Sequence, residues 1–478
     1  MCGIIMLSGP NAASRLPGCL SRLRHRGPDD QGTWFDGDVA LGFTRLTING
    51  DEIIGHQPYE HEGLLGAING EIYNHRELRR TEGLPSSECD TDVVLPLLAR
   101  HGSHSIDELD GFYSAVVLQP RTREALCLRD HMGKKPLFVG RSLTEVFITS
   151  ELKALDQCGW FKLLPRGVAK VDLHTGAVLQ VAAHRPVLTD LDLPAAFELA
   201  VRKRMPGPDQ PVGVFLSGGL DSSLVAAFAA RLRKDVTYLT LGNAEGSDRQ
   251  AVDDVVAALG LVDVRAVPLP EPESLPALIQ AVVHATESFN PSIVGNGLAT
   301  YLLAQAARDA SIKVVLTGEG ADELFGGYHS FNEQEPWFDV RRQLIDDMQV
   351  TELRRLDMSC MAHSVEPRCP FLDRAVRAIS DGLGFPDLYD GGENKMALRR
   401  GFEGVLPLEV LHRRKTSFDV GSGIRGEVVR YLRRNDRSER EELREVWDGL
   451  FRHESSEPYF HAYPVFDDAI DRRGETHR

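Results

Sequence analysis

The sequence predicts an α/β protein of two domains, a β-rich N-terminal domain over residues 1–182 and a doubly wound parallel sheet within residues 195–478. The chain has 478 residues, which is too many for one ordinary hydrophobic core. Strand patterns with turn signals fill the first part, whereas strands alternate with helices in the second. Between the two, "AAHRPVLTDLDLP" loses periodicity, so we expect a linker over residues 182–194.

In the N-terminal domain, short apolar or alternating runs recur between turn-forming residues. Examples are "VALGFTRLTI", "LLGAINGEIY" and "FYSAVVLQP", which are typical of strands in packed sheets. The stretch "DTDVVLPLLARHG" predicts a helix. The stretch "VAKVDLHTGAVLQV" predicts a hairpin with "HTG" at its tip.

The second domain starts with a predicted helix, "AAFELAVRKRM", followed by the strand "VGVFL", a glycine-rich loop and the helix "SSLVAAFAARLRK". The strand "VTYLTLG", the helix "DRQAVDDVVAALG" and the strand "IKVVLTG" continue the alternation, which favours a doubly wound parallel sheet. Ligands of such sheets bind at the carboxyl ends of the strands. Beyond residue 330 we expect a mostly helical, polar region.

Composition limits the possible functions. The chain is 42% hydrophobic and 26% charged, which is typical of soluble globular proteins. No apolar run approaches the roughly 20 residues that cross a bilayer, and the start lacks the basic segment of a secretory signal. The net charge of −16 argues against non-specific binding to nucleic acid or anionic membranes. We therefore expect a cytoplasmic protein without membrane or nucleic-acid partners.

The cysteines and histidines show no metal-binding pattern. Seven cysteines form no CxxC pair, and sixteen histidines show no HExxH spacing. An odd, scattered set of cysteines in a chain of this size indicates reduced thiols. We expect no structural zinc.

Cys2 directly follows the initiator methionine. Removal of Met1 would leave Cys2 with a thiol and a free α-amine on one residue, which together provide a nucleophile and its general base. The alternative is that Cys2 only starts a buried strand, because free cysteine packs well as a small hydrophobe. Residue two alone favours the structural alternative.

The glycine-rich loop "VFLSGGLDSS" lies between a predicted strand and a predicted helix. Its adjacent glycines allow backbone N–H groups to approach a phosphate, and the helix N-terminus adds a favourable dipole. The loop lacks the lysine of a Walker A motif and carries Asp221 instead, which suits Mg²⁺ beside a polyphosphate. The alternative is a structural strand-to-helix turn.

A second acidic loop, "GEGADELFGGY", follows the predicted strand "IKVVLTG". It places Glu319, Asp322 and Glu323 between glycines at another strand end. Carboxylates at such a place are costly without a cation, so the two loops could share Mg²⁺ around a pyrophosphate. An exposed turn with acidic caps is the alternative, but it does not account for the density of glycines.

Together these motifs resemble a known family. "SGGLDSS" resembles the pyrophosphate-binding loop of the ATP pyrophosphatase superfamily, and with "GEGADELFGGY" it is similar to the synthetase domain of glutamine-hydrolysing asparagine synthetases. "MCGI", "RHRGPDDQG", "TRLTI", "NGEIYNH" and "CDTDV" resemble, in order, the motifs of class II glutamine amidotransferases. The resemblance spans residues 1–425. It implies an N-terminal α+β sandwich of antiparallel sheets, of the N-terminal-nucleophile type, over residues 1–182.

For the N-terminal domain, the resemblance implies glutamine hydrolysis at Cys2. The thiolate would attack the side-chain amide of glutamine while the α-amine transfers the proton. The Asn69 side chain and the Gly70 N–H would stabilise the oxyanion of the tetrahedral intermediate.

The resemblance also implies a binding site for the glutamine main chain. The forked guanidinium of Arg45 would bind the α-carboxylate, and Glu71 and Asp90 would bind the α-ammonium. Taken singly, Arg45 would be a surface strand residue and "NGE" a turn. In a chain with cysteine at position two, the functional interpretation is preferred.

For the second domain, the resemblance implies ATP and Mg²⁺. The residues implied to hold the pyrophosphate are Ser217, Gly218, Gly219, Asp221, Ser222 and Ser223. Those implied to enclose adenosine are Leu216, Leu241, Thr317 and Gly318. Asp221 and Asp322 would bind Mg²⁺, and Glu319 would orient or deprotonate ammonia.

Two basic residues lie in further family-like stretches. Lys415, in "RRKTSF", would neutralise charge on the reacting phosphorus and the departing pyrophosphate, unless it is an ordinary surface lysine in a basic run. Arg368, in "EPRCPFLD", receives no role from the sequence.

The implied reaction is glutamine-dependent asparagine synthesis. A carboxylate attacks the α-phosphorus of ATP and forms an acyl-adenylate, with pyrophosphate released. Ammonia must then reach the adenylate unprotonated, so we expect a dry passage between the domains, lined by small and apolar residues. The implied substrates are glutamine, ATP and aspartate or another carboxylate. The sequence does not give the oligomeric state, and a homodimer is plausible by family analogy only.

Two alternatives stay open. The lysine segment "RRKTSFDVGSG" departs from the family pattern, "ESFNPSIVGNG" does not reveal the acceptor, and residues after 425 carry no recognisable motif. A sister amidotransferase could therefore act on a different carboxylate, such as a specialised metabolite, a peptide or a cell-wall intermediate. A non-catalytic scaffold would be expected to lose the nucleophile or the metal carboxylates, yet Cys2, Asn69, Asp221 and Asp322 are all present.

Overall fold

The computed structural model describes residues 2–50, 54–120, 122, 124–142, 144–242, 247–328, 337–413, 418–435 and 437–462. These residues divide into two compact units. The first unit contains residues 2–185 together with 361–364 and 450–455, and the second contains the other described residues. Within the ranges given, no helix combines the length and the apolar character that crossing a bilayer requires.

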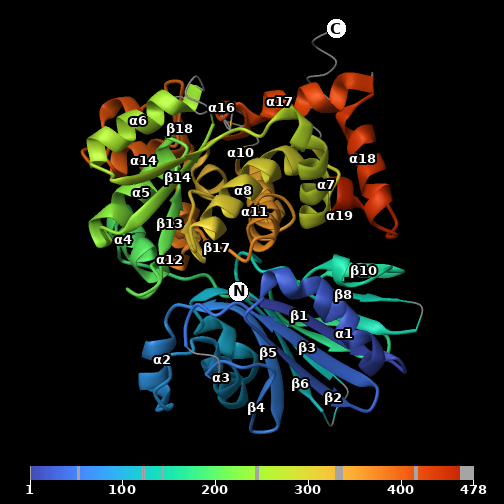
Figure 1. Cartoon of the computed structure of the whole chain (residues 1–478). Helices are drawn as coiled ribbons and strands as arrows, with labels where there is room; N and C mark the ends of the chain where they lie inside the picture. The colour runs from blue at the N-terminus through green and yellow to red at the C-terminus, as the bar shows by residue number, and fades with distance from the viewer. Residues whose placement is uncertain are drawn as a thin grey trace. The chain divides into compact units, whose positions relative to one another are not determined.

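The first unit is built on two six-stranded antiparallel sheets, coloured blue to teal in Figure 1. Across the first sheet the order is β10 (Trp160–Leu163), β8 (Phe138–Arg141), β9 (Val146–Thr149), β1 (Cys2–Ser8), β3 (Val39–Arg45) and β2 (Asp30–Asp36). Across the second it is β12 (Val178–Ala182), β11 (Gly167–Asp172), β7 (Glu124–Arg129), β6 (Gly111–Gln119), β5 (Leu64–Ile72) and β4 (Tyr59–His61). The predicted hairpin is confirmed as the antiparallel pair β11–β12.

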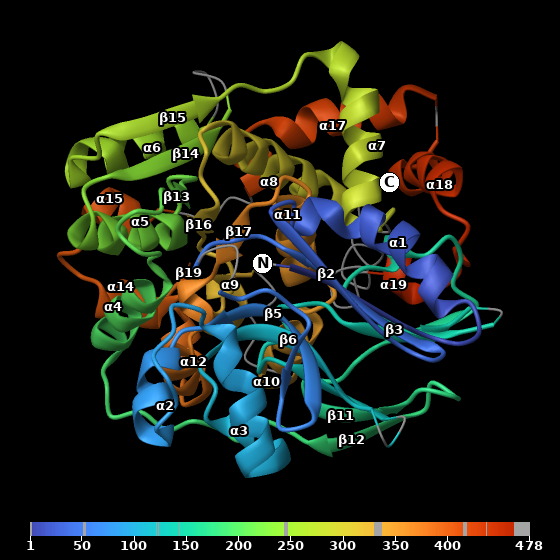
Figure 2. The ribbon, with the colours of Figure 1, turned by 60° about the horizontal axis from the view of Figure 1, so that its bottom comes forward.

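Helices cover the outer faces of both sheets (Figure 2). The helix α1 (Ala12–Leu23) packs on β1 and β3, and α3 (Val94–His101) packs on β5. The other helical segments of this unit are α2 (His75–Glu82), η1 (Arg24–Arg26), η2 (Thr91–Val93), η3 (Gly102–Asp107) and η4 (Leu152–Ala154). The helix predicted in "DTDVVLPLLARHG" is confirmed as η2 continued by α3.

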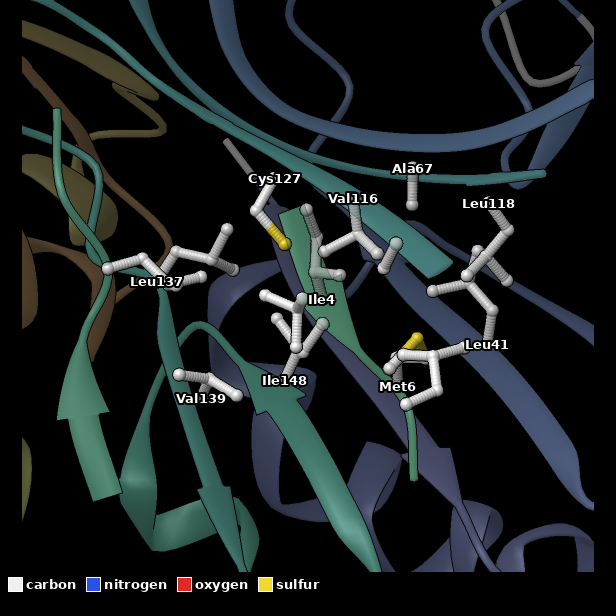
Figure 3. Close-up of a cluster of buried hydrophobic side chains, with 14 of the residues drawn as sticks. Ile4, Met6, Leu41, Ala67, Val116, Leu118, Cys127, Leu137, Val139 and Ile148 are labelled. Atoms are coloured by element: carbon white, nitrogen blue, oxygen red, sulfur yellow. The ribbon is translucent and has the colours of Figure 1, made fainter. Parts of the chain in front are cut away.

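The core of the first unit lies between its two sheets (Figure 3). Alternate residues of β1, such as Ile4 and Met6, meet Ala67 of β5 and Val116 of β6. Burying a large apolar side chain contributes about 1.5–3 kcal/mol, so this layer fixes the register of every strand that enters it. The same alternation sends Cys2 to the inner side at the end of the core.

The second unit contains a five-stranded parallel sheet, which confirms the predicted doubly wound fold. Its order is β15 (Asp263–Val267), β14 (Val236–Leu241), β13 (Val212–Phe215), β16 (Val314–Leu316) and β17 (Glu366–Arg368). The main helices beside it are α4 (Leu193–Arg204), α5 (Leu220–Leu232), α6 (Ser247–Leu259), α7 (Leu275–Thr286) and α8 (Pro291–Asp309), with η5 (Pro272–Ser274) before α7. Helices α5 and α8 pack on opposite faces of the sheet (Figure 1).

The strand order reverses between β13 and β16. Chain connections leave these two neighbouring strands in opposite directions, which opens a crevice at their carboxyl ends. The two loops that carry "SGGLDSS" and "GEGADELFGGY" follow these two strands directly. The fold therefore brings both sequence motifs to one edge of one sheet.

The region after residue 330 is mostly helical in its described part, as expected. Its helical segments are α10 (Trp337–Asp347), α11 (Glu352–Met361), η7 (Pro370–Leu372), α12 (Arg374–Asp381), α13 (Phe385–Leu388), α14 (Met396–Gly401), α15 (Leu408–Leu411), α16 (Phe418–Gly421), α17 (Ile424–Leu432), η8 (Arg433–Asn435), α18 (Glu439–Leu450) and α19 (Pro458–His461). Just before it lies α9 (Ala321–Phe325), and a short hairpin joins β18 (Tyr389–Asp390) to β19 (Glu393–Asn394).

The strand β17 was not predicted. Its three residues are Glu, Pro and Arg, which have low strand propensity. The ion pair between Arg368 Nε and Glu366 Oε1, at 2.6 Å, allows these two charges to be buried in the strand. Arg368 also donates to the carbonyl oxygen of Arg204, at the end of α4, so its contacts here are structural.

Candidate active sites

The first candidate site lies where Cys2 starts β1. Cys2 is directly opposite Arg45 in the antiparallel pair of β1 and β3, so their side chains share one face of the sheet. From the facing sheet, Asn69 of β5 approaches Cys2, and the Cys2 backbone nitrogen donates to Asn69 Oδ1 at 2.9 Å. The structure thus brings together the implied nucleophile, the implied oxyanion donor and the implied carboxylate-binding arginine.

The side-chain amide of Asn69 offers a hydrogen-bond donor to the site. This side chain is fully buried, and among the described residues Asn69 Nδ2 has no hydrogen-bond partner. Leaving a buried N–H unpaired costs about 1–3 kcal/mol, which suggests that a bound group completes it. An oxyanion formed beside Cys2 is the chemical species that such a donor would stabilise.

Glycine is required at position 70 because backbone atoms of the neighbouring strand β6 lie very close to it. Its φ is +148°, and a Cβ there would lie 2.2 Å from the carbonyl oxygen of Phe112 and 2.6 Å from Cα of Tyr113. Any side chain at this position would push β5 away from β6. Glycine therefore holds Asn69 at its distance from Cys2.

The glutamine-binding residues implied by the sequence form a connected, buried polar cluster. Arg45 Nη2 donates to the carbonyl oxygens of Asn49 and Ile54, at 3.1 and 2.7 Å. Asn49 Nδ2 donates in turn to Glu71 Oε1 at 2.5 Å. Asp90 is also buried, and its Oδ2 accepts from the backbone nitrogen of Ile72, the neighbour of Glu71. This end of the sandwich gathers one cation and two carboxylates, which suits the charges of an amino acid.

Sequence reasoning missed Arg26, which holds the backbone of Cys2. Arg26 is fully buried; its Nε donates to the carbonyl oxygen of Cys2 at 2.9 Å and its Nη1 to Glu151 Oε1 at 2.5 Å. Burial raises the pKa of Glu151, but Lys153, His25 and Arg26 lower it more, so the pKa lies well below its usual value. The available signal was the motif "RHRGPDDQG", which contains Arg26 but does not reveal its partner.

The second candidate site is a cavity of about 720 Å³ in the second unit, at the carboxyl ends of β13 and β16. Sequence-predicted residues on its wall are Ser217, Gly219, Asp221, Ser222, Thr317, Gly318, Glu319 and Asp322. Four other predicted residues are buried outside its lining, namely Leu216, Gly218, Ser223 and Leu241.

The loop after β13 is held by its own serines. Ser222 Oγ accepts from the backbone nitrogen of Ser217 at 3.1 Å and donates to the carbonyl oxygen of Gly219 at 3.2 Å. These bonds shape the turn that precedes α5, a helix of 13 residues whose N-terminus faces the cavity through Leu220 and Asp221. A helix N-terminus with exposed N–H groups is a favourable place for a phosphate.

The two motif loops contact each other at Gly318. A Cβ on Gly318 would lie 2.9 Å from Cβ of Asp221 and 3.0 Å from the backbone nitrogen of Ser222. A side chain at 318 would therefore displace the loop that carries Asp221. Glycine at this position allows Asp221 and Asp322 to approach one centre.

That centre holds Lys395, which sequence reasoning also missed. Lys395 Nζ lies 2.5 Å from Asp221 Oδ2 and 2.6 Å from Asp322 Oδ1. Burial lowers the pKa of the Lys395 ammonium, but the two carboxylates raise it more, so its pKa lies above the usual value. The hairpin β18–β19 delivers this lysine in a left-handed backbone conformation, with φ of +59°.

Asp221 and Asp322 fit the implied Mg²⁺. The contact with Lys395 shows that the two carboxylates converge on one cation, and oxygen ligands of this kind suit Mg²⁺. Both carboxylates lie on the cavity wall. The donor set is therefore compatible with Mg²⁺ beside a bound polyphosphate.

Glu352 adds a further carboxylate to this wall, and Glu323 lies next to Asp322 outside the cavity lining. Glu323 is buried and accepts at Oε1 from the hydroxyl of Tyr328 at 2.5 Å. Burial, followed by the nearby Glu352 and Asp322, raises the pKa of Glu323 well above its usual value. A bound cation would relieve this concentration of negative charge.

The remaining residues predicted from the sequence lie in different places. Lys415 lies outside the described residues. Arg413, two positions earlier, lines the cavity and pairs with Asp248 at 2.6 Å. The stretch "ESFNPSIVGNG" leads into α8, whose Ser292 and Asn296 line the cavity.

Comparison with known proteins covers both units. Residues 1–177 match the family model described as "Glutamine amidotransferase domain", and residues 192–348 and 339–462 match the one described as "Asparagine synthase". An asparagine synthetase [glutamine-hydrolyzing] of Sandersonia aurantiaca is 33% identical over 468 residues, which cover 88% of this chain and 87% of the relative. The chain belongs to the glutamine-hydrolysing asparagine synthetase family.

Two legume relatives are similarly close. The nodule asparagine synthetase of Pisum sativum is 32% identical over 470 residues, and asparagine synthetase 2 of Lotus japonicus is 31% identical over 468 residues. Each match covers 88% of this chain and 78% of the relative. Membership of the asparagine synthetase family assigns the chain to ATP-dependent ligases that hydrolyse glutamine.

Proposed function

We propose that this protein is a glutamine-dependent asparagine synthetase, which hydrolyses glutamine at Cys2 and uses the ammonia to amidate an adenylated aspartate. The observation that carries the proposal is the presence, in one chain, of a thiol beside an unpaired amide donor and of two carboxylates that share one cation at a nucleotide-sized cavity. The family relationship across both units supports the same conclusion.

In the first unit, the Cys2 thiolate attacks the glutamine side-chain amide. The α-amine of Cys2, exposed once Met1 is removed, accepts the thiol proton and returns it to the departing ammonia. Asn69 Nδ2 and the Gly70 N–H stabilise the oxyanion, and Arg26 keeps the Cys2 backbone in place. Water then releases glutamate from the thioester.

In the second unit, the acceptor carboxylate attacks the α-phosphorus of ATP. The bond to pyrophosphate breaks and an acyl-adenylate forms, which converts a poor leaving group into AMP. Asp221 and Asp322 would hold Mg²⁺, which neutralises charge on the phosphates when bound. Lys395 is a second cation at the same place and stabilises the negative charge of the departing pyrophosphate.

Ammonia then attacks the acyl carbon, with Glu319 as the group that orients it and accepts its proton. Attack requires unprotonated ammonia, so the transfer between the two reactions has to avoid bulk water. The proposed reaction therefore requires a path for ammonia that excludes water.

The first test measures pyrophosphate release with ATP, Mg²⁺ and glutamine over a panel of carboxylic acids that includes aspartate. Release that depends on aspartate, with asparagine formed, supports the proposal. Glutaminase activity without any response to aspartate would instead favour the sister amidotransferase, with a different acceptor.

Cys2→Ala should abolish glutamine use and retain activity with ammonium, because only the first reaction needs the thiol. Loss of both activities would contradict this division.

A further inference from the structure

Glu319 has an ion-pair partner that neither the sequence motifs nor the proposed mechanism includes. Arg355, on α11, donates from Nη2 to Glu319 Oε1 at 2.7 Å. The Arg355 side chain is only 10% exposed and that of Glu319 is 25% exposed, and both residues lie on the cavity wall. The pair is therefore shielded from bulk water on one side and open to the cavity on the other.

The guanidinium is fixed from a second direction. Arg355 Nη1 donates to Thr300 Oγ1 at 3.1 Å, and the Thr300 hydroxyl donates to the carbonyl oxygen of Asn296, one turn earlier in α8. Thr300 and Asn296 also line the cavity. A planar, forked guanidinium that is held at two nitrogens has little freedom to rotate. Arg355 thus links the loop after β16 to the wall formed by α8.

Packing fixes the backbone on both sides of Glu319, so Arg355 acts on the direction of the Glu319 side chain. Gly318 and Gly320 flank Glu319, and Gly320 has φ of +95°. A Cβ on Gly318 would lie 2.9 Å from Cβ of Asp221, and a Cβ on Gly320 would lie 2.2 Å from Cδ2 of Leu372, so the loop packs closely on both sides. The Glu319 carboxylate itself is held by Arg355, through the hydrogen bond that its Oε1 accepts.

The two cations of this wall divide the carboxylates into separate groups. Lys395 contacts Asp221 and Asp322, whereas Arg355 contacts Glu319. In the proposed mechanism the first group is the one that faces pyrophosphate. Glu319 is joined instead to α11 by Arg355, whose other contact is with Thr300 of α8.

We propose that Arg355 is a positioning residue that holds Glu319 for the capture of ammonia, with Thr300 fixing the guanidinium. The inference rests on the proposed function. In the step concerned, the ammonia nitrogen forms a bond to the acyl carbon, the bond from that carbon to the AMP oxygen breaks, and AMP leaves with the electron pair. The proton lost from nitrogen passes to Glu319, whose position Arg355 sets.

The test separates adenylate formation from ammonia capture in the full-length protein. Pyrophosphate and amide are measured in the same reaction with ATP, Mg²⁺, aspartate and saturating ammonium, for wild type and Arg355→Gln. A well-placed general base contributes about 10²–10⁴ in rate, so we expect the amide formed per pyrophosphate to fall about tenfold or more while pyrophosphate release falls much less. The adenylate would then be lost to water.

Conservative variants distinguish positioning from folding. Arg355→Lys keeps the charge and should restore part of the amide yield, whereas Thr300→Val keeps the ion pair, removes the tether and should lower the yield less than Arg355→Gln. Equal losses of pyrophosphate and amide in all three variants would show a structural role and overturn the proposal. An unchanged ratio of amide to pyrophosphate in Arg355→Gln would also overturn it. If Arg355→Gln does not fold, the same ratio is measured in Arg355→Lys and Thr300→Val, and an unchanged ratio in both overturns the proposal.

The outcome is distinguishable from failure of the proposed function. If wild type releases no pyrophosphate in response to aspartate, the asparagine synthetase assignment fails before Arg355 is tested. The ratio of amide to pyrophosphate is then measured with the carboxylic acid that does support pyrophosphate release, and it decides the role of Arg355 in that reaction. Glutamine hydrolysis at Cys2, in the other unit, serves as the control for the integrity of each variant.

Discussion

Lys395 Nζ lies 2.5 Å from Asp221 Oδ2, although 174 positions separate the two residues in the sequence. The same ammonium contacts Asp322 at 2.6 Å, so one lysine joins the loops that follow β13 and β16. The sheet places both loops at its switch point, and the hairpin β18–β19 brings the lysine to them. A cation at this point reduces the repulsion between the two carboxylates. It also reduces their repulsion of a phosphate substrate that approaches them.

Lys395→Gln should strongly reduce pyrophosphate release. The amide removes the positive charge that stabilises the departing pyrophosphate in the proposed mechanism, and losses of about 10²–10³ are typical for one electrostatic contact to a transition state. Lys395→Arg should recover part of the rate. The measurement is pyrophosphate release with saturating ammonium, with glutaminase activity as the control. A wild-type rate in the glutamine variant would remove Lys395 from the reaction.

Much of the site was predictable because its motifs are local. The glycines, serines and acids of "SGGLDSS" and "GEGADELFGGY" mark two strand-to-helix loops, and the parallel sheet brings such loops together. Cys2 and Asn69 likewise lie in strands, β1 and β5, whose alternation points both side chains inward.

What the sequence did not reveal depends on tertiary contacts between distant residues. Lys395 stands in "GGENKMALRR" and Arg355 in "ELRRLDM", where each resembles an ordinary helix-surface cation. Only the packing of α11 and of the β18–β19 hairpin shows that both are buried at the cavity. The strand β17 escaped prediction for a related reason, because its charged residues Glu366 and Arg368 neutralise each other in the fold.

Glu151→Gln should impair glutamine hydrolysis and destabilise the first unit. Arg26 and Glu151 are both fully buried, and breaking such a pair leaves an uncompensated charge that costs about 3–5 kcal/mol. Arg26 would then hold the carbonyl oxygen of Cys2 less firmly, so the rate of glutamine hydrolysis should fall as well. Thermal unfolding and glutaminase kinetics measure the two effects. Unchanged values for both would show that the pair neither stabilises the unit nor orients Cys2.

Gly70→Ala should inactivate the glutaminase. The added Cβ would meet the Phe112 carbonyl oxygen at 2.2 Å, so β5 must shift and Asn69 must move away from Cys2. Loss of one oxyanion donor alone costs about 10²–10³ in rate. Gly18→Ala is the matched control, because Gly18 lies in α1, is exposed and has no atom within 4 Å of the new Cβ. It should be neutral or stabilise by up to about 1 kcal/mol, since alanine favours helix. Equal activity in both variants would exclude a role for the Gly70 position.

His453 should make the stability of the first unit depend on pH. This buried residue accepts at Nδ1 from the backbone nitrogen of Cys158, at 3.2 Å, and burial lowers the pKa of His453 to about 4 although a backbone hydrogen bond at Leu152 raises it. Between the unfolded pKa of about 6.5 and the folded value, the unfolded chain binds a proton that the folded chain does not. The contribution of His453 is therefore complete above about pH 6.5 and is lost as the pH falls toward 4, by at most about 3 kcal/mol.

The corresponding measurement is the melting temperature of wild type and His453→Gln from neutral pH to about pH 4.5, chosen to lie between the two pKa values. Wild type should lose more stability over this range than the variant, while the exposed His174→Gln should follow wild type. Burial also lowers the pKa of His75 to about 4, so the variant should retain part of the pH dependence. Parallel curves for wild type and His453→Gln would mean that residues 450–455 pack on the first unit without any linkage to protons. A smaller loss of melting temperature in His453→Gln than in wild type would show instead that protonation of His453 weakens the packing of residues 450–455 on the first unit.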